Sequence, residues 1–156
     1  MKKISPEIYF LRYARPCADF LRQRDEINDE QLKLIDDMLY EIIPPQKNFI
    51  EQIFHRAIVP LKEMSSNNYW NIDVLKEYFQ KKHNELVDCG AEGFEHLMGF
   101  QKELCKVHEA RIVKIMPDYY EVFYENKFDN VLKGFVKNAN IDDIVFIHYK
   151  MVVEKK

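Results

Sequence analysis

Three side chains in the C-terminal third of the sequence have the chemistry to bind a metal ion: Cys105, His108 and His148. A thiolate and an imidazole together suit iron, zinc or copper. Cys105 and His148 are the better pair, and His108 could add a third donor if the chain bends just after the cysteine. The simpler interpretation of the same pair is a buried, inert thiol and a strand histidine with an ordinary hydrogen bond.

The segment that must position these side chains has strand character from residue 105 onward. β-Branched residues run up to the turn pair Pro117-Asp118, and aromatic residues alternate with others after it. Gly134 predicts a bulge or bend of the kind that curls a sheet into a barrel. Short strands with such closely spaced turns predict a small sandwich or barrel. The expected strands span residues 105–116, 119–125, 128–137, 144–149 and 151–153.

A family signature is visible in residues 141–155, which read IDDIVFIHYKMVVEK. Together with the upstream cysteine, this run resembles the HypC/HupF hydrogenase-maturation chaperones, small OB-like β-barrel proteins with a signature of the type V-G-D-x-V-x-V-H-x-G-x-A-I. The resemblance covers about the last third of the chain and places the family's cysteine on Cys105 and its histidine on His148. It implies an OB-like barrel whose first and fourth strands are neighbours, which would bring these two side chains within ligand reach.

The preceding residues have the start and stop signals of helices. Ser5-Pro6 is a helix start, because a hydroxyl cap precedes a proline at the first helical position. Asn28 with Gln31 predicts a capping box, and Gly90 is suited to end the last long helix. The expected helices start near residues 5, 28, 50 and 71.

Two prolines predict interruptions in these helices. Pro16 should kink or restart the first helix, and Pro60 should bend the periodic helix over residues 50–64. His83 is interpreted as a polar residue on the last long helix, and residues 91–104 are either a short weak helix or an ordered linker.

Helices first and strands afterwards is the segregated pattern of an α+β protein. We therefore expect an N-terminal helical bundle in residues 1–103, followed by a small five-stranded OB-like (HypC-like) β-barrel in residues 104–156. The length of 156 residues is sufficient for a buried core.

Composition indicates an ordinary globular protein, with 47% hydrophobic and 31% charged residues. No apolar run approaches a membrane span, and the first residues lack the apolar core of a signal peptide, so we expect a cytoplasmic protein without a membrane partner. An odd count of 3 cysteines favours reduced thiols over a disulfide framework.

Several functional classes lack their signals. A net charge of −3 argues against nucleic-acid binding, which depends on clustered Lys and Arg. The chain has 4 glycines and no G-x-x-x-x-G-K, G-x-G-x-x-G or G-x-S-x-G motif. No pair of carboxylates stands out for acid–base work, and a non-enzyme is favoured.

Three functional hypotheses follow. The first is an accessory or chaperone-like protein of metalloenzyme maturation, of the hydrogenase type, which binds iron or zinc through Cys105, His148 and His108 and acts on a metalloenzyme or another maturation factor. The second is a protein-protein adaptor without metal, and leftover apolar surface would favour a homodimer. The third is an OB-type single-strand nucleic-acid binder that uses the aromatic residues Tyr119, Tyr120, Phe123, Tyr124 and Phe128 for stacking.

Overall fold

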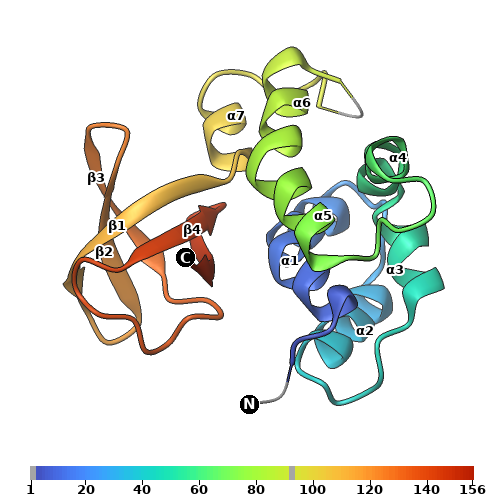
Figure 1. Cartoon of the computed structure of the whole chain (residues 1–156), viewed down its shortest axis with the longest axis horizontal. Helices are drawn as coiled ribbons and strands as arrows, with labels where there is room; N and C mark the ends of the chain where they lie inside the picture. The colour runs from blue at the N-terminus through green and yellow to red at the C-terminus, as the bar shows by residue number, and fades with distance from the viewer. Residues whose placement is uncertain (1–2, 92–93) are drawn as a thin grey trace. The chain divides into compact units, whose positions relative to one another are not determined.

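The computed structural model describes residues 3–91 and 94–156. These divide into two compact units, Met1–Leu97 and Met98–Lys156. Helices form the first unit, and a closed five-stranded barrel with one short helix forms the second among the described residues (Figure 1). The expected α+β organisation, with helices first and a small barrel afterwards, is confirmed. The expected domain boundary after residue 103 falls within the short helix of the second unit.

The helices of the first unit begin at the expected caps. The Ser5 hydroxyl accepts a hydrogen bond from the Ile8 amide at 3.3 Å, and Asn28 and Gln31 form the predicted capping box. Gly90 has a φ of 70°, the left-handed conformation typical of a residue that ends a helix. The elements are α1 (Pro6–Gln23), α2 (Asp29–Leu39), α3 (Lys47–Ile53), α4 (His55–Met64), α5 (Ile72–Glu77), a π-helical turn η1 (Tyr78–Lys82) and α6 (His83–Cys89).

The interruptions differ from those that the prolines predict. Pro16 lies inside an unbroken α1, and Pro60 lies inside α4. The periodic segment breaks instead at Phe54, where φ is −104° and ψ is 37°. The break coincides with packing, because the buried Phe54 ring meets the ring of Phe10 edge-on at 5.5 Å. Tertiary contacts, and not a proline, therefore mark the break in this segment.

An aromatic cluster around Phe10 forms the centre of the first unit. The Phe10 ring is fully buried and lies 5.3 Å from the ring of Trp70 and 5.4 Å from that of Phe79, both edge-on. Such geometry is favourable beyond the area that it buries. This cluster joins α1 to the later helices.

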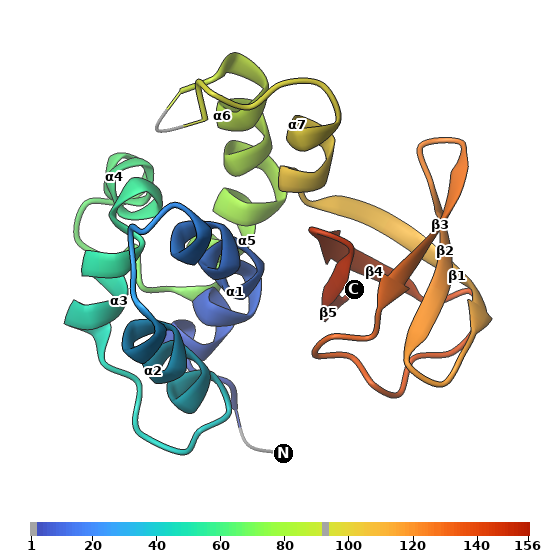
Figure 2. The same ribbon diagram turned by 180° about the vertical axis from the view of Figure 1, so that it is seen from behind.

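The second unit consists of one helix and the barrel. The sheet order is β1-β2-β3-β5-β4, and β1 closes the barrel by pairing antiparallel with both β2 and β4. β5 pairs antiparallel with β4, beside which Figure 2 shows it, and in parallel with the end of β3 through Leu132 and Met151. The elements are α7 (Phe100–Cys105), β1 (His108–Ile115), β2 (Tyr119–Tyr124), β3 (Lys127–Leu132), β4 (Ile144–His148) and β5 (Met151–Lys155).

Two strand predictions need correction. Cys105 is not the first residue of a strand but the last residue of α7, since residues 101–104 are strong helix formers. The third strand ends at Leu132, so Gly134 is not a bulge within it. Gly134 lies in the following loop with a φ of 54°. Of the stretch 91–104, residues 92–93 lie outside the described part of the chain.

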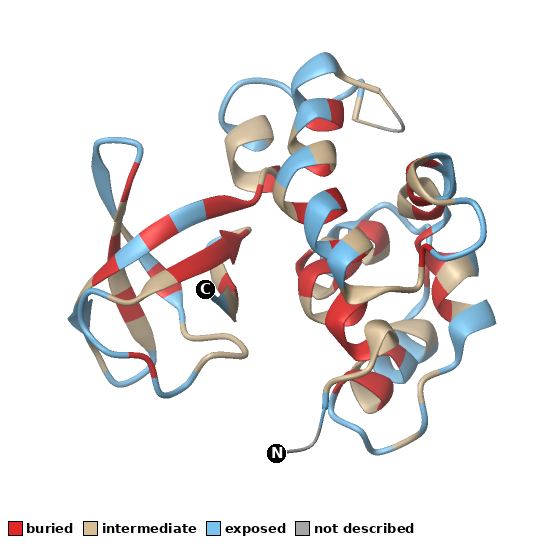
Figure 3. Ribbon diagram, in the orientation of Figure 1, coloured by how far each residue is buried: buried red, intermediate tan, exposed pale blue. Residues whose placement is uncertain are grey.

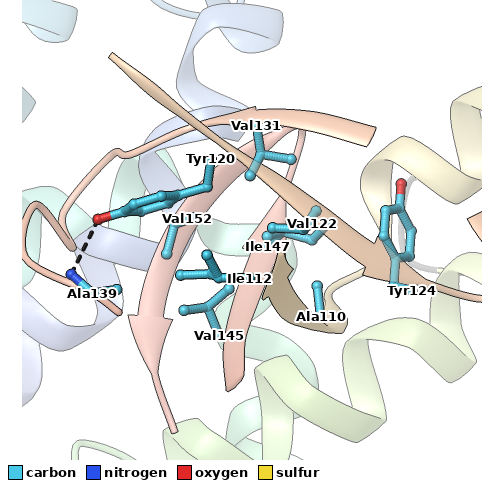
Figure 4. Packing of buried hydrophobic residues seen from close by; sticks show 10 residues of the cluster. All are labelled: Ala110, Ile112, Tyr120, Val122, Tyr124, Val131, Ala139, Val145, Ile147 and Val152. Atoms are coloured by element: carbon cyan, nitrogen blue, oxygen red, sulfur yellow. Dashed lines mark hydrogen bonds between the residues drawn. The ribbon is translucent and has the colours of Figure 1, made fainter. Parts of the chain in front are cut away.

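Alternating side chains fill the barrel. Along β1, buried and exposed residues alternate from His108 to Ile112, as expected for a strand with one face on the core (Figure 3). The Tyr120 hydroxyl donates to the Val136 carbonyl at 2.8 Å and accepts from the Ala139 amide at 3.2 Å (Figure 4). The interior cluster is Ala110, Ile112, Tyr120, Val122, Tyr124, Val131, Ala139, Val145, Ile147 and Val152.

Among the described residues, no helix has the length and apolar character that crossing a membrane requires.

Candidate metal centre

Cys105 is positioned by the end of α7. Lys106 leaves the helix in an extended conformation and leads directly into β1. The Leu104 carbonyl, which has no partner within the helix, accepts a hydrogen bond from the Tyr149 amide at 3.0 Å. This bond joins the end of α7 to the turn between β4 and β5, one residue beyond His148.

His148 is the last residue of β4 and points away from the barrel interior. Val145 and Ile147 belong to the interior cluster, so His148 lies on the opposite face of the strand. The turn that follows has positive φ at Tyr149 (48°) and Lys150 (59°), as in a tight two-residue hairpin. Its geometry aims the Tyr149 amide at α7 and brings His148 toward Cys105.

Cys105 and His148 therefore come together although they are far apart in the sequence. The Cys105 Sγ and one imidazole nitrogen of His148 lie within 4.8 Å of each other, and both residues are buried, with exposures of 2% and 1%. Two such atoms on one zinc ion are about 4.4 Å apart or less, given bond lengths of about 2.3 Å to sulfur and 2.1 Å to nitrogen. The two donors are therefore near enough to be considered as ligands of one ion.

His108 lies on a different face. It pairs with Ile147 in the β1–β4 ladder and points to the interior, as do Ala110 and Ile112 after it. Strand β1 pairs with β4 without a register shift from His108 to Arg111, and its one irregularity lies further along, between Ile112 and Lys114, so β1 has no bend at His108. The structure groups His108 instead with Glu103 and Glu125.

The group formed by Glu103, His108 and Glu125 is held by two contacts of the imidazole. His108 Nε2 lies 2.7 Å from the Glu103 carbonyl oxygen, and Nδ1 lies 3.2 Å from Glu125 Oε1. Glu103 Oε2 is 3.8 Å from His108 Nε2, and Glu103 Oε1 is 2.9 Å from Lys106 Nζ. The sequence contained no signal for this group, because the three residues come from a helix, a strand and a turn without regular spacing.

Negatively charged side chains surround His108. The Tyr124 ring lies 5.0 Å from the His108 ring. Burial and then the carboxylate of Asp129, which accepts a hydrogen bond from the phenol at 3.3 Å, raise the pKa of Tyr124 to about 12. Glu125 and Glu103 contribute to the same rise in pKa. Three carboxylates thus act on this end of the barrel.

Of the five aromatic residues proposed for stacking, Tyr119 is half-buried and the other four divide into two pairs. Tyr120 and Tyr124 belong to the interior cluster and are explained by packing. Phe123 and Phe128 form a cross-strand pair with ring centres 5.0 Å apart, and Phe128 is 65% exposed. Only this second pair, among the aromatic residues predicted to stack, has a ring open to solvent to that extent.

No protein-family model matches the chain, and no curated protein matches it with significant sequence similarity.

Proposed function

We propose that the protein is a metal-binding accessory factor, chaperone-like, of the kind that serves metalloenzyme maturation. The observation that carries the proposal is the approach of the Cys105 thiol to the His148 imidazole within 4.8 Å. A soft thiolate with an imidazole fits iron or zinc, and a metal-ligating thiol is bound in its deprotonated form. A partner metalloenzyme or maturation factor would receive the ion.

Two donors from the second unit suit a carrier. Cys105 and His148 occupy two positions of a coordination sphere that usually has four or more. On this proposal, small ligands, water or side chains of a receiving protein supply the remaining positions. An ion held in this way can leave one ligand at a time, which favours transfer over permanent storage.

The barrel supports the resemblance to the HypC/HupF chaperones. Its β1-β2-β3-β5-β4 order makes β1 and β4 neighbours, as an OB-like barrel of that family requires. Cys105 is internal in the chain and offers a thiol without a terminal amine, so on this proposal the cargo is held by the thiolate and the imidazole alone.

The experiment is metal analysis after anaerobic purification. We expect about one equivalent of iron or zinc per chain in the wild type, and less than about a tenth in Cys105→Ala and in His148→Ala. Cys89→Ala is the matched control, because Cys89 is an exposed thiol in the other unit. A wild-type content below about a tenth under iron- and zinc-replete growth would contradict the proposal.

Cobalt substitution provides a second measurement on the same variants. Co²⁺ bound to a thiolate has a sulfur-to-metal charge-transfer absorption in the near ultraviolet, which should be present in Cys89→Ala and absent in Cys105→Ala. A metal-free protein that still bound its partner would favour the adaptor hypothesis.

A nucleic-acid function has one specific observation in its favour, the exposed Phe128 beside Phe123. Stacking on such a pair is worth about 1–3 kcal/mol per base. A salt-dependent gel shift with single-stranded RNA or DNA that is lost in Phe128→Ala would favour this alternative.

A further inference from the structure

His108 has one hydrogen bond whose direction is determined by its partner. The Glu103 carbonyl oxygen, 2.7 Å from Nε2, can only accept, so Nε2 carries a hydrogen and donates it. In the neutral ring this leaves Nδ1 with a lone pair and no hydrogen. That lone pair faces Glu125 Oε1 at 3.2 Å, and a carboxylate oxygen is also an acceptor.

Two acceptors at this distance call for a cation. The cation is either a proton on Nδ1, which makes the ring an imidazolium, or a metal ion bound by Nδ1 and the carboxylate. The hydrogen bond from Nε2 to the Glu103 carbonyl is the arrangement expected when Nδ1 binds a metal ion. Metal-ligating histidines almost always donate their other N–H to a carbonyl or carboxylate. The Glu103 carbonyl therefore orients the ring as it would be oriented for a metal ligand.

The side chains around His108 suit a divalent ion. One atom each of Glu103, His108 and Glu125 can be chosen within 4.8 Å of one another. His108 is 9% exposed and rigidly placed, whereas the side chains of Glu103 and Glu125 are 42% and 54% exposed. Both carboxylates can therefore rotate toward an ion while the barrel stays unchanged.

Charge favours the ion as well. Two carboxylates in the group and Asp129 beyond Tyr124 act on the same end of the barrel. Two of these carboxylates are paired with lysines, since Lys106 Nζ lies 2.9 Å from Glu103 Oε1 and Lys150 Nζ lies 3.1 Å from Asp129 Oδ1. Lys106 is consequently a competitor of the ion for Glu103.

We propose that Glu103, His108 and Glu125 form a second cation site, selective for a divalent ion that accepts one nitrogen and two oxygen ligands, such as Mn²⁺. Imidazole and carboxylate ligands suit Mn²⁺, Fe²⁺ and Zn²⁺. The site differs in chemistry from the Cys105–His148 pair and does not depend on it.

The test uses Mn²⁺ and the full chain. Paramagnetic broadening of backbone amide signals, followed by NMR during a Mn²⁺ titration, should begin at Glu103, His108 and Glu125. Glu125→Gln should weaken Mn²⁺ binding at least about tenfold, the lower end of the effect of losing even a supporting residue of a metal site. This variant changes an exposed side chain and leaves the buried histidine in place.

The controls separate this site from general acidity and from the thiol pair. Glu121→Gln removes the same charge from β2, outside the group, and should leave Mn²⁺ binding unchanged, and so should Cys105→Ala. Lys106→Gln should increase the affinity severalfold, because it removes the competing cation. Equal broadening in Glu125→Gln and Glu121→Gln would overturn the proposal. So would an imidazolium signal for His108 that saturating Mn²⁺ does not alter, since a proton would then be the cation.

Discussion

The hydroxyl of Tyr120 makes two hydrogen bonds inside the barrel. Its ring is fully buried, yet its hydroxyl satisfies both the Val136 carbonyl and the Ala139 amide. These two groups belong to the long loop between β3 and β4. The phenol thus links the middle of the loop to the interior of the barrel, whereas backbone bonds such as Phe135 N–H to the Val152 carbonyl and Asp142 N–H to the Ile112 carbonyl hold its two ends.

Tyr120→Phe should lower the free energy of opening of this loop by about 1–3 kcal/mol, because it leaves the Ala139 amide without its partner. Hydrogen exchange of the Ala139 amide measures the change directly. Tyr119→Phe is the control, since Tyr119 is the neighbouring residue and only partly buried. Unchanged protection of Ala139 in Tyr120→Phe would contradict the role given to the hydroxyl.

The sequence indicated which residue types form the candidate site, but not the directions in which their side chains point. A cysteine and a histidine with useful chemistry were recognisable, and the β1–β4 pairing does bring Cys105 to His148. That His108 points inward follows from the phase of β1, which begins at His108 and not at residue 105. Because side chains alternate along a strand, the start of the ladder decides which histidine can meet the thiol.

At the scale of elements, Gly134 determines how closely the loop after β3 approaches β5. A Cβ at this position would lie 2.2 Å from the Val152 carbonyl oxygen and 2.6 Å from Met151 Cγ. The positive φ of 54° adds strain for any other residue. A side chain there would force the loop and the strand apart.

Gly134→Ala should therefore cost about 3 kcal/mol or more in the free energy of unfolding of the barrel, from overlap and backbone strain together. Gly99→Ala is the control, because Gly99 also has a positive φ, 50°, but nothing within 4 Å of the added Cβ. Gly99→Ala should therefore lower the free energy of unfolding by less than Gly134→Ala does. Hydrogen exchange of β-strand amides in both variants gives the two values, and equal losses would contradict the close approach as the cause.

Helix ends were predictable where a side chain marks them, and not where packing does. The caps at Ser5 and Asn28 are local hydrogen bonds, and local residue types specify them. The break at Phe54 depends on an aromatic contact with α1, and the π-helical turn η1 interrupts what a periodic pattern presents as one helix. Short α7 lacks a side-chain cap, which hid it among strand-like residues.

At the scale of the whole molecule, each unit can be followed with its own probe. Trp70 is the one tryptophan of the sequence, and its ring packs on Phe10 in the first unit. Its fluorescence therefore reports on the helical unit, and amide exchange of the strands reports on the barrel.

His83 makes the stability of the helical unit depend on pH. It was interpreted as a polar helix residue, but it is buried among the rings of Tyr78, Phe79 and Phe94. Desolvation lowers its pKa from 6.5 to about 4, against a smaller opposite effect of Asn84. The sequence could not reveal this, because burial of one helix face depends on tertiary contacts.

The sign of the effect follows from the lowered pKa. Well above pH 6.5 the imidazole is neutral whether the chain is folded or not, and its full contribution to the free energy of unfolding is present. As the pH falls from 6.5 toward 4, the unfolded chain binds a proton that the folded chain excludes, and about 3 kcal/mol is lost. Urea unfolding followed by Trp70 fluorescence should show this loss.

His83→Leu should weaken the dependence of the free energy of unfolding on pH between 6.5 and 4, whatever its effect on stability at neutral pH. His55→Gln, at an exposed position, should leave the dependence as in the wild type. An equally steep loss of stability in His83→Leu would assign the effect to carboxylates instead.

The closure of the barrel by β1 and β4 also has a consequence for biosynthesis. Cys105 leaves the ribosome well before His148, and the two side chains meet only after β4 has emerged and paired with β1. A nascent chain therefore exposes the thiol without its imidazole, and on the proposed function both donors can hold an ion only after β4 has been synthesised and has paired with β1.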